Sequence, residues 1–117
     1  MNIHMNNYIV KAELIDWKPL IEKEIHYEGV FVKSLHFDKE KQRSTTILIK
    51  FEKGSSYPYH NHPAGEELFV LEGEVIIEGA LLKKGDYLFT PPGCKHSVRT
   101  EIGCTILFII PEEVEII

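Results

Sequence analysis

Short runs of β-branched and aromatic residues, separated by turn-forming residues, follow one another closely from residue 30 onward. No long segment shows the 3.6-residue period of an amphipathic helix, so the pattern predicts an all-β sandwich or barrel. Turns are expected at 38–41, 53–54, 72–73, 78–79, 84–86 and 91–93, where Gly, Pro, Asp and Lys gather. The strands expected between them cover residues 30–37, 44–52, 66–71, 74–77, 80–82, 87–90, 96–100 and 104–110.

Residues 1–29 lack this alternation, and we expect them to form an N-terminal segment that packs on one barrel domain spanning 30–117. A short helical turn is predicted over 16–24 with Asp16 as its N-cap, although Pro19 lies inside it. Trp17 is expected to anchor the segment on the barrel. A chain of 117 residues has room for one compact core.

Several expected strands are apolar at consecutive positions: LFVL at 68–71, VII at 75–77 and ILFII at 106–110. Such strands have both faces covered. The first thirty residues could supply the cover, but they are few for so many apolar faces. We therefore expect a homodimer.

Charge and hydropathy argue against two classes of partner. The net charge is −5 and no Lys/Arg cluster occurs, so neither a nucleic acid nor a membrane is predicted as a partner. The longest apolar stretch, 105–111, is too short to span a bilayer, and the N-terminus lacks the features of a signal peptide. A cytoplasmic location is expected, with Cys94 and Cys104 as free thiols.

The stretch HNHPAGEE, residues 60–67, holds two of the chain's six histidines and two adjacent glutamates. Residues two apart on a strand point to the same side, so His60 and His62 can present both imidazoles to one point. Glu66 shares the apolar face of the next strand, whereas Glu67 is expected to point outward. Taken alone, the stretch fits either a metal site or a polar surface turn.

The spacing around this stretch resembles the cupin superfamily. The first cupin motif is matched by Gly54, His60, His62, Glu66 and Gly73, and the second by Gly85, Pro91, Gly93 and His96. The resemblance covers about residues 43–110 and implies a double-stranded β-helix, the jelly-roll barrel of cupins. It also implies that His60, His62, Glu66 and His96 converge on one divalent metal. Thr100 departs from the second motif, which often has Asn there, at a position that is not a ligand.

Three imidazoles and one carboxylate suit a divalent transition metal, and sequence does not choose among Fe, Mn, Ni, Cu, Co and Zn. One or two open coordination positions would remain for a small-molecule ligand or substrate. Tyr57, Tyr59 and Phe89 lie close in sequence to the ligand positions and are pocket candidates, as is Cys104. For each of these four residues, plain packing is the alternative role.

A further likeness, over about residues 14–110, is to the ChrR-like cupin group. The residues that show this likeness are Trp17, the strand 44–51, EELFVLEGE at 66–74 and PPGCKHS at 91–97. That group includes regulatory domains of zinc-dependent anti-sigma factors and, more distantly, an iron enzyme that cleaves β-diketones. Two functions are therefore open: a metal-dependent, dioxygenase-like enzyme acting on a small molecule, or a ligand- or metal-sensing regulatory module. The residues ahead of the first motif lack the clustered His and Cys of a sigma-binding zinc domain, which disfavours a stand-alone anti-sigma factor.

Overall fold

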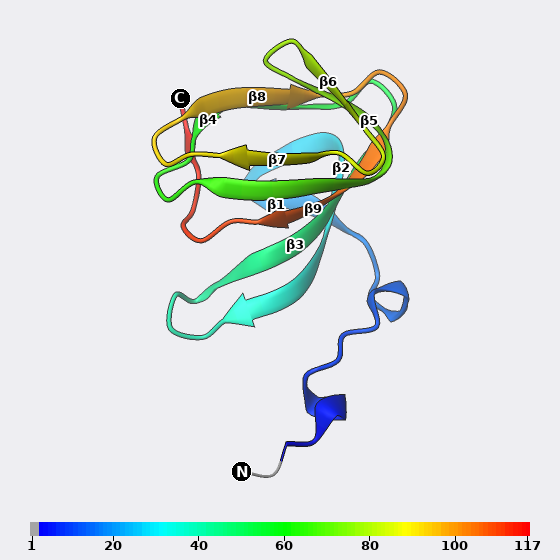
Figure 1. Ribbon diagram of the computed structural model, residues 1–117, viewed down its shortest axis with the longest axis vertical. Helices are drawn as coiled ribbons and strands as arrows, with labels where there is room; N and C mark the ends of the chain where they lie inside the picture. Colours follow the sequence, from blue (N-terminus) through cyan, green and yellow to red (C-terminus); the bar gives the residue numbers. More distant parts are fainter. Residues whose placement is uncertain (1–2) are drawn as a thin grey trace.

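The computed structural model describes residues 3–117, and its strands curl into a barrel from which an N-terminal arm extends (Figure 1). The described residues contain two short 3₁₀ helices and ten strands. These are η1 (Met5–Asn7), η2 (Ala12–Leu14), β1 (Lys18–Glu22), β2 (Ile25–Asp38), β3 (Arg43–Phe51), β4 (Ser56–Asn61), β5 (Glu66–Ile77), β6 (Ala80–Lys83), β7 (Tyr87–Thr90), β8 (Lys95–Arg99), β9 (Cys104–Ile109) and β10 (Glu115–Ile116). Across residues 3–117 no helix has the length and apolar character needed to cross a membrane.

The strand order is β1-β2-β3-β9-β5-β8-β4-β10, with β6 and β7 also paired to β5. All pairings are antiparallel. The long strand β5 pairs with β9 and β7 through its first half and with β6 and β8 through its second. It therefore joins the two sheets of the barrel. The predicted all-β jelly-roll class is confirmed.

Gly73 lies where β5 passes from one sheet to the other. The register with β9 shifts between Val70 and Glu72, and the φ angle of Gly73 is +76°. A Cβ atom there would lie 2.0 Å from the carbonyl oxygen of Gly103, which no side chain tolerates. The break predicted at 72–73 is therefore a bend inside one continuous strand, and only glycine fits it.

Apolar side chains fill the interior where the sheets face each other. Val30, Val70, Val75 and Ile106 are fully buried, and Leu68 is 1% exposed. These residues come from β2, β5 and β9, so the core is built on the strands that pair over the greatest length. Alternate residues of the same strands point outward, as the two-residue period of a strand requires.

The helical turn predicted over 16–24 is wrong, because residues 18–22 form β1. Pro19 has no N–H group to continue a helix, and Lys18 to Glu22 pair instead with β2. The chain reverses at Lys23 and Glu24, both of which have positive φ. Leu20 is 7% exposed, so β1 contributes to the core. The sheet thus includes residues 18–29, ahead of residue 30, where the barrel was expected to start.

Candidate metal centre

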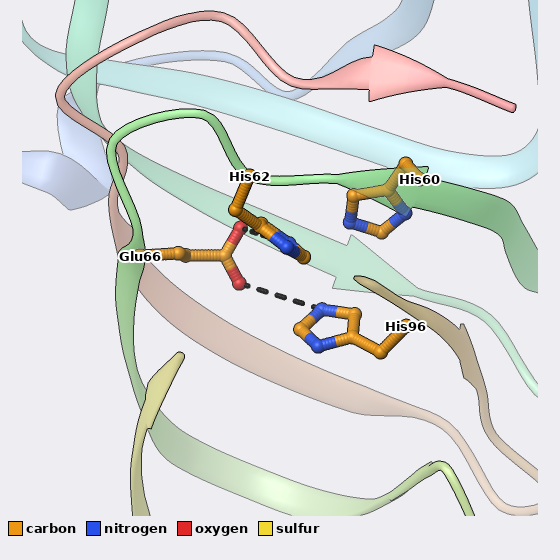
Figure 2. Close-up of side chains that lie close together, drawn as sticks. All are labelled: His60, His62, Glu66 and His96. Atoms are coloured by element: carbon orange, nitrogen blue, oxygen red, sulfur yellow. Dashed lines mark ion pairs between the residues drawn. The ribbon is translucent and has the colours of Figure 1, made fainter. Parts of the chain in front are cut away.

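Two neighbouring strands and the start of a third place four polar side chains at one point inside the barrel (Figure 2). His60 is on β4 and His96 is directly opposite it on β8. His62 follows the end of β4, and Glu66 is the first residue of β5. All four side chains are buried, with exposed fractions of 4% or less. Residues more than thirty positions apart in sequence are brought together because β4 and β8 pair.

The possible ligand atoms of His60, His62, Glu66 and His96 all lie within 4.8 Å of one another. The two carboxylate oxygens of Glu66 divide between two rings: Oε2 is 3.3 Å from Nε2 of His62, and Oε1 is 3.7 Å from Nε2 of His96. Two donors that bind one transition metal at about 2.1 Å each are at most about 4.2 Å apart. The cluster is therefore close to the size of a single-ion site and could hold one.

Backbone carbonyl groups fix the orientation of two of the rings. Nδ1 of His60 lies 2.7 Å from the carbonyl oxygen of Pro58, and Nδ1 of His62 lies 2.7 Å from that of Cys94. A carbonyl oxygen only accepts, so each Nδ1 carries the proton and donates it. The lone pair of a neutral ring is then on Nε2, which is the arrangement that an outer partner imposes on a metal-binding histidine.

Three buried polar atoms of the cluster find no hydrogen-bond partner among residues 3–117: Nε2 of His62, Nε2 of His96 and Oε1 of Glu66. Burying such atoms without a partner costs about 1–3 kcal/mol each. A cation placed among them would satisfy all three at once. The donor set, imidazole nitrogen and carboxylate oxygen, is also the one that divalent transition metals bind, so the residues present fit such an ion.

Burial and the neighbouring polar groups together set the pKa values of the three rings. It lowers the pKa of His60 to about 4, with the neighbouring His62 adding to the effect. Burial, His62 and His60 together lower the pKa of His96 to about 3. For His62 burial acts in the same direction, but the Glu66 carboxylate and the Cys94 carbonyl outweigh it, and the pKa is raised. At neutral pH His60 and His96 therefore have free lone pairs.

A cavity of about 430 Å³ opens beside the cluster, and His60 and Glu66 form part of its wall. The rest of the wall is mostly apolar and comes from the inner faces of several strands, with Val32, Ile49, Phe51, Val98 and Phe108 among its residues. A few polar side chains, including Glu22 and Arg43, lie in the same wall. A mostly apolar hollow of this size with a few polar groups is typical of small-molecule sites.

Tyr57 lines the cavity, as expected for a pocket residue, and is 8% exposed. Its ring meets His60 edge to face, with centroids 4.9 Å apart, and its hydroxyl donates to Oε1 of Glu22 at 2.5 Å. Burial, and then the Glu22 carboxylate, raise the pKa of the Tyr57 hydroxyl. The phenol thus keeps its proton at neutral pH and holds β1 against the strand that carries His60.

The other three pocket candidates lie elsewhere. Tyr59 and Phe89 are about half exposed and are absent from the cavity wall. Cys104 is buried at the start of β9 and lines a separate shallow hollow with Gly73 and Gly103. Burial raises the pKa of its thiol to about 11, so it is not poised as a thiolate.

Sequence reasoning missed Glu22 and Arg43, which also line the cavity. Neither is a position of the two cupin motifs, and the cavity wall contains them because β1 pairs with β2 and β2 with β3. The Arg43 guanidinium donates to the carbonyl oxygen of Ile110 at the other end of the chain. No local pattern in the sequence marks either residue as part of a site.

The chain is similar to several known proteins over part of its length. The chain is 37% identical over 65 residues to the DNA damage-repair/toleration protein DRT102 of Arabidopsis thaliana, covering 50% of this chain and 21% of that protein. It is 44% identical over 58 residues to the dimethylsulfoniopropionate lyase DddQ of Ruegeria pomeroyi, covering 45% of this chain and 29% of that protein. These matches thus span less than a third of either relative.

Among solved structures, that of a proposed acetylacetone dioxygenase from Methylibium petroleiphilum PM1 has a TM-score of 0.82 and 17% sequence identity. The match covers 100% of this chain and 85% of that one, and it shows a shared fold. The model of the ChrR cupin-like domain matches residues 5–111. This chain therefore belongs to the ChrR cupin-like domain family, within the cupin superfamily.

Proposed function

We propose that His60, His62, Glu66 and His96 bind one divalent transition metal ion and that the protein is a metal-dependent, dioxygenase-like enzyme acting on a small molecule. The observation that carries the proposal is the position of the cluster. His60 and Glu66 belong both to the four-residue group and to the wall of the 430 Å³ cavity. An ion held by the group would therefore face the space that a substrate fills.

Four protein ligands leave one or two positions open on a five- or six-coordinate ion. When bound, such an ion supplies Lewis-acid or redox chemistry. The protein's own residues supply the rest. The apolar wall takes the body of the substrate and excludes water from the centre, and the Nδ1 hydrogen bonds of His60 and His62 keep the rings in place.

Side-chain acid–base chemistry has less support in the described residues. Glu67 points outward and accepts a hydrogen bond from the Tyr87 hydroxyl. Glu22 lies in the cavity wall, but its Oε1 accepts the Tyr57 hydroxyl. Tyr57 itself keeps its proton because its pKa is raised. We therefore assign the reaction to the metal centre and the binding of substrate to the cavity.

Two similarities set the choice of substrates to test. The shared fold with a proposed acetylacetone dioxygenase supports oxidative cleavage of a β-diketone, and the partial match to a dimethylsulfoniopropionate lyase supports a non-oxidative cleavage. A regulatory module that binds a ligand or metal without turnover is the second candidate, and the family match to the ChrR cupin-like domain favours it.

The deciding experiment is a turnover screen of protein loaded separately with Fe(II), Mn(II), Ni(II), Cu(II), Co(II) and Zn(II). The substrates are acetylacetone, dimethylsulfoniopropionate, a thiol and a sugar, with oxygen uptake recorded beside substrate loss. Metal-dependent loss of acetylacetone with oxygen uptake would support the dioxygenase-like enzyme, and loss of substrate without uptake would point to a lyase. Metal binding and saturable ligand binding without turnover would support the regulatory module. The His60→Ala/His96→Ala variant is the control for metal-independent turnover.

A further inference from the structure

The N-terminal arm, residues 3–17, is apolar but extends away from its own barrel (Figure 1). The molecule measures 48 × 29 × 28 Å, and the arm extends along the longest axis. Six large apolar side chains of the arm are between 48% and 80% exposed: Ile3, Met5, Tyr8, Ile9, Val10 and Leu14. An extended segment gains nothing from exposing so many apolar side chains to water.

The outer face of the barrel is also apolar over four adjacent strands. The register places Leu48 of β3 opposite Leu107 of β9, Leu107 opposite Phe69 of β5, and Phe69 opposite Tyr87 of β7. The four therefore form one row on the face that points away from the metal cluster. In the next row, Ile109 and Phe89 flank Glu67. Phe69, Ile109, Tyr87 and Phe89 are 39–55% exposed, whereas Leu48 is only 9% exposed. The exposed part of this face therefore lies on β5, β7 and β9.

The arm leaves the barrel beside this outer face. The Trp17 ring lies under two lysine ammonium groups, Nζ of Lys33 at 4.6 Å and Nζ of Lys50 at 4.9 Å from its centroid. Lys33 also donates to the carbonyl oxygen of Ala12 at 2.8 Å. Lys33 lies opposite Leu48 in the pairing of β2 with β3, so the root of the arm borders the apolar row. Lys33 and Trp17 thus fix where the arm starts, while residues 3–10 reach beyond the barrel.

We propose that the occupant of this face is a second copy of the same chain, in a symmetric dimer in which each arm lies across the outer face of its partner. Two unpartnered apolar surfaces in the described residues then cover each other without a third component. A two-fold axis makes the contact self-complementary, since arm meets face and face meets arm. The root of the arm, fixed at the border of the face, allows this exchange.

The area available is sufficient. A stable dimer buries about 800 Å² per partner. A single aromatic side chain covers about 150–250 Å² when fully buried. Ten partly exposed apolar side chains on the arm and the face supply area of that order, and four of them are aromatic: Tyr8, Phe69, Tyr87 and Phe89. Within the face, the Glu67 carboxylate accepts a hydrogen bond from the Tyr87 hydroxyl, which offsets part of the cost of covering its charge.

The test is sedimentation equilibrium of the full-length chain and three single variants. Phe69→Lys changes the face, Leu14→Asp changes the arm, and Leu81→Lys is the matched control, since Leu81 is an exposed apolar residue on β6 outside both surfaces. We expect the parent and Leu81→Lys to be dimers at micromolar concentration. Phe69→Lys and Leu14→Asp should each raise the dimer dissociation constant by about 30-fold or more, as loss of a central apolar contact does.

Each alternative result overturns the proposal. A monomeric parent would mean that no second copy covers the face. If Phe69→Lys leaves the dimer dissociation constant unchanged, the interface lies elsewhere. If Phe69→Lys weakens the dimer but Leu14→Asp does not, the arm is not part of the interface. The substituted residues are exposed, so all variants should fold; far-UV circular dichroism and thermal unfolding check this. If Phe69→Lys fails that check, Tyr87→Lys on the same row takes its place.

Discussion

Nδ1 of His62 donates a hydrogen bond to the carbonyl oxygen of Cys94 at 2.7 Å. This contact links the segment that follows β4 to the segment that precedes β8, the strand of His96. The backbone N–H of His62 meets the same oxygen at 3.2 Å, and the N–H of Gly93 donates to the carbonyl oxygen of His62 at 2.8 Å. The turn after β4 is thus tied to the turn before β8. The ring of His62 is oriented by a segment thirty residues away, which also leads into His96.

The bend of β5 at Gly73 gives a prediction about stability. Replacing Gly73 with alanine should lower the free energy of unfolding by several kcal/mol, because the new Cβ would meet the Gly103 carbonyl oxygen at 2.0 Å. The matched control is Gly79→Ala, where φ is also positive but, apart from its chain neighbours, no atom of residues 3–117 lies within 4 Å of the new Cβ. Only the left-handed penalty of about 1–2 kcal/mol applies there. Denaturant unfolding measures both, and equal losses would contradict the account.

The lowered pKa values of His60 and His96 predict that the metal-free protein loses stability as the pH falls. Between about pH 6.5 and 4 the unfolded chain takes up protons at these residues while the folded chain does not, so the free energy of unfolding falls as pH falls. The slope is at most about 1.4 kcal/mol per pH unit for each histidine. The raised pKa of His62 has the opposite effect on stability, but it is a single contribution and the lowered pKa values of His60 and His96 are two.

Urea unfolding of chelator-treated protein at pH 7.5 and pH 5.5 measures this dependence. The control is the His60→Gln/His96→Gln variant, in which both titrating rings are absent. We expect a smaller loss of stability on acidification in the variant than in the parent. The same loss in both would show that burial of these rings is not its cause.

The hydrogen bond between Tyr57 and Glu22 predicts a difference between two neighbouring tyrosines. Tyr57→Phe leaves Oε1 of Glu22 without its donor and should cost about 1 kcal/mol of unfolding free energy. Tyr59→Phe, at an exposed position on the same strand, should change stability by less than about 0.5 kcal/mol. Metal content should be unchanged in both. If thermal unfolding finds the two variants alike, Tyr57 does not hold β1 in the way described.

The two thiols should react at different rates. Cys94 is exposed, whereas Cys104 is buried and burial raises its pKa to about 11. A chromogenic disulfide reagent is therefore expected to modify one thiol rapidly and the second only after unfolding. Cys94→Ser should abolish the rapid phase. Two rapid equivalents in the folded parent would contradict the buried position of Cys104.

Much of the barrel could be predicted because turn residues and strand composition are local signals. The strand at 87–90 was predicted with its observed bounds, and Glu66 and Glu67 were assigned to opposite faces as the structure has them. The bend at Gly73 could not be distinguished from a break, because the clash that requires glycine comes from Gly103, thirty residues away. β1 was missed because its partner strand, not its own sequence, stabilises it.

Part of the candidate site could likewise be predicted from the sequence, and part could not. Motif spacing was enough to predict the four-residue cluster, since the spacing follows from which strands pair. The cavity could not be predicted, because Glu22 and Arg43 enter it through long-range pairing of β1, β2 and β3. β10 lies against β4 through only two residue pairs, too few to leave a pattern in the sequence.

Elemental analysis of the untagged protein, purified without chelator, tests the central claim most directly. The His60→Ala/His96→Ala variant is prepared in parallel, with circular dichroism to show that it is folded. We expect close to one transition-metal ion per chain in the parent and its loss in the variant. A parent that holds no metal and takes none up on reconstitution, or a folded variant that retains the parent's metal, would contradict it.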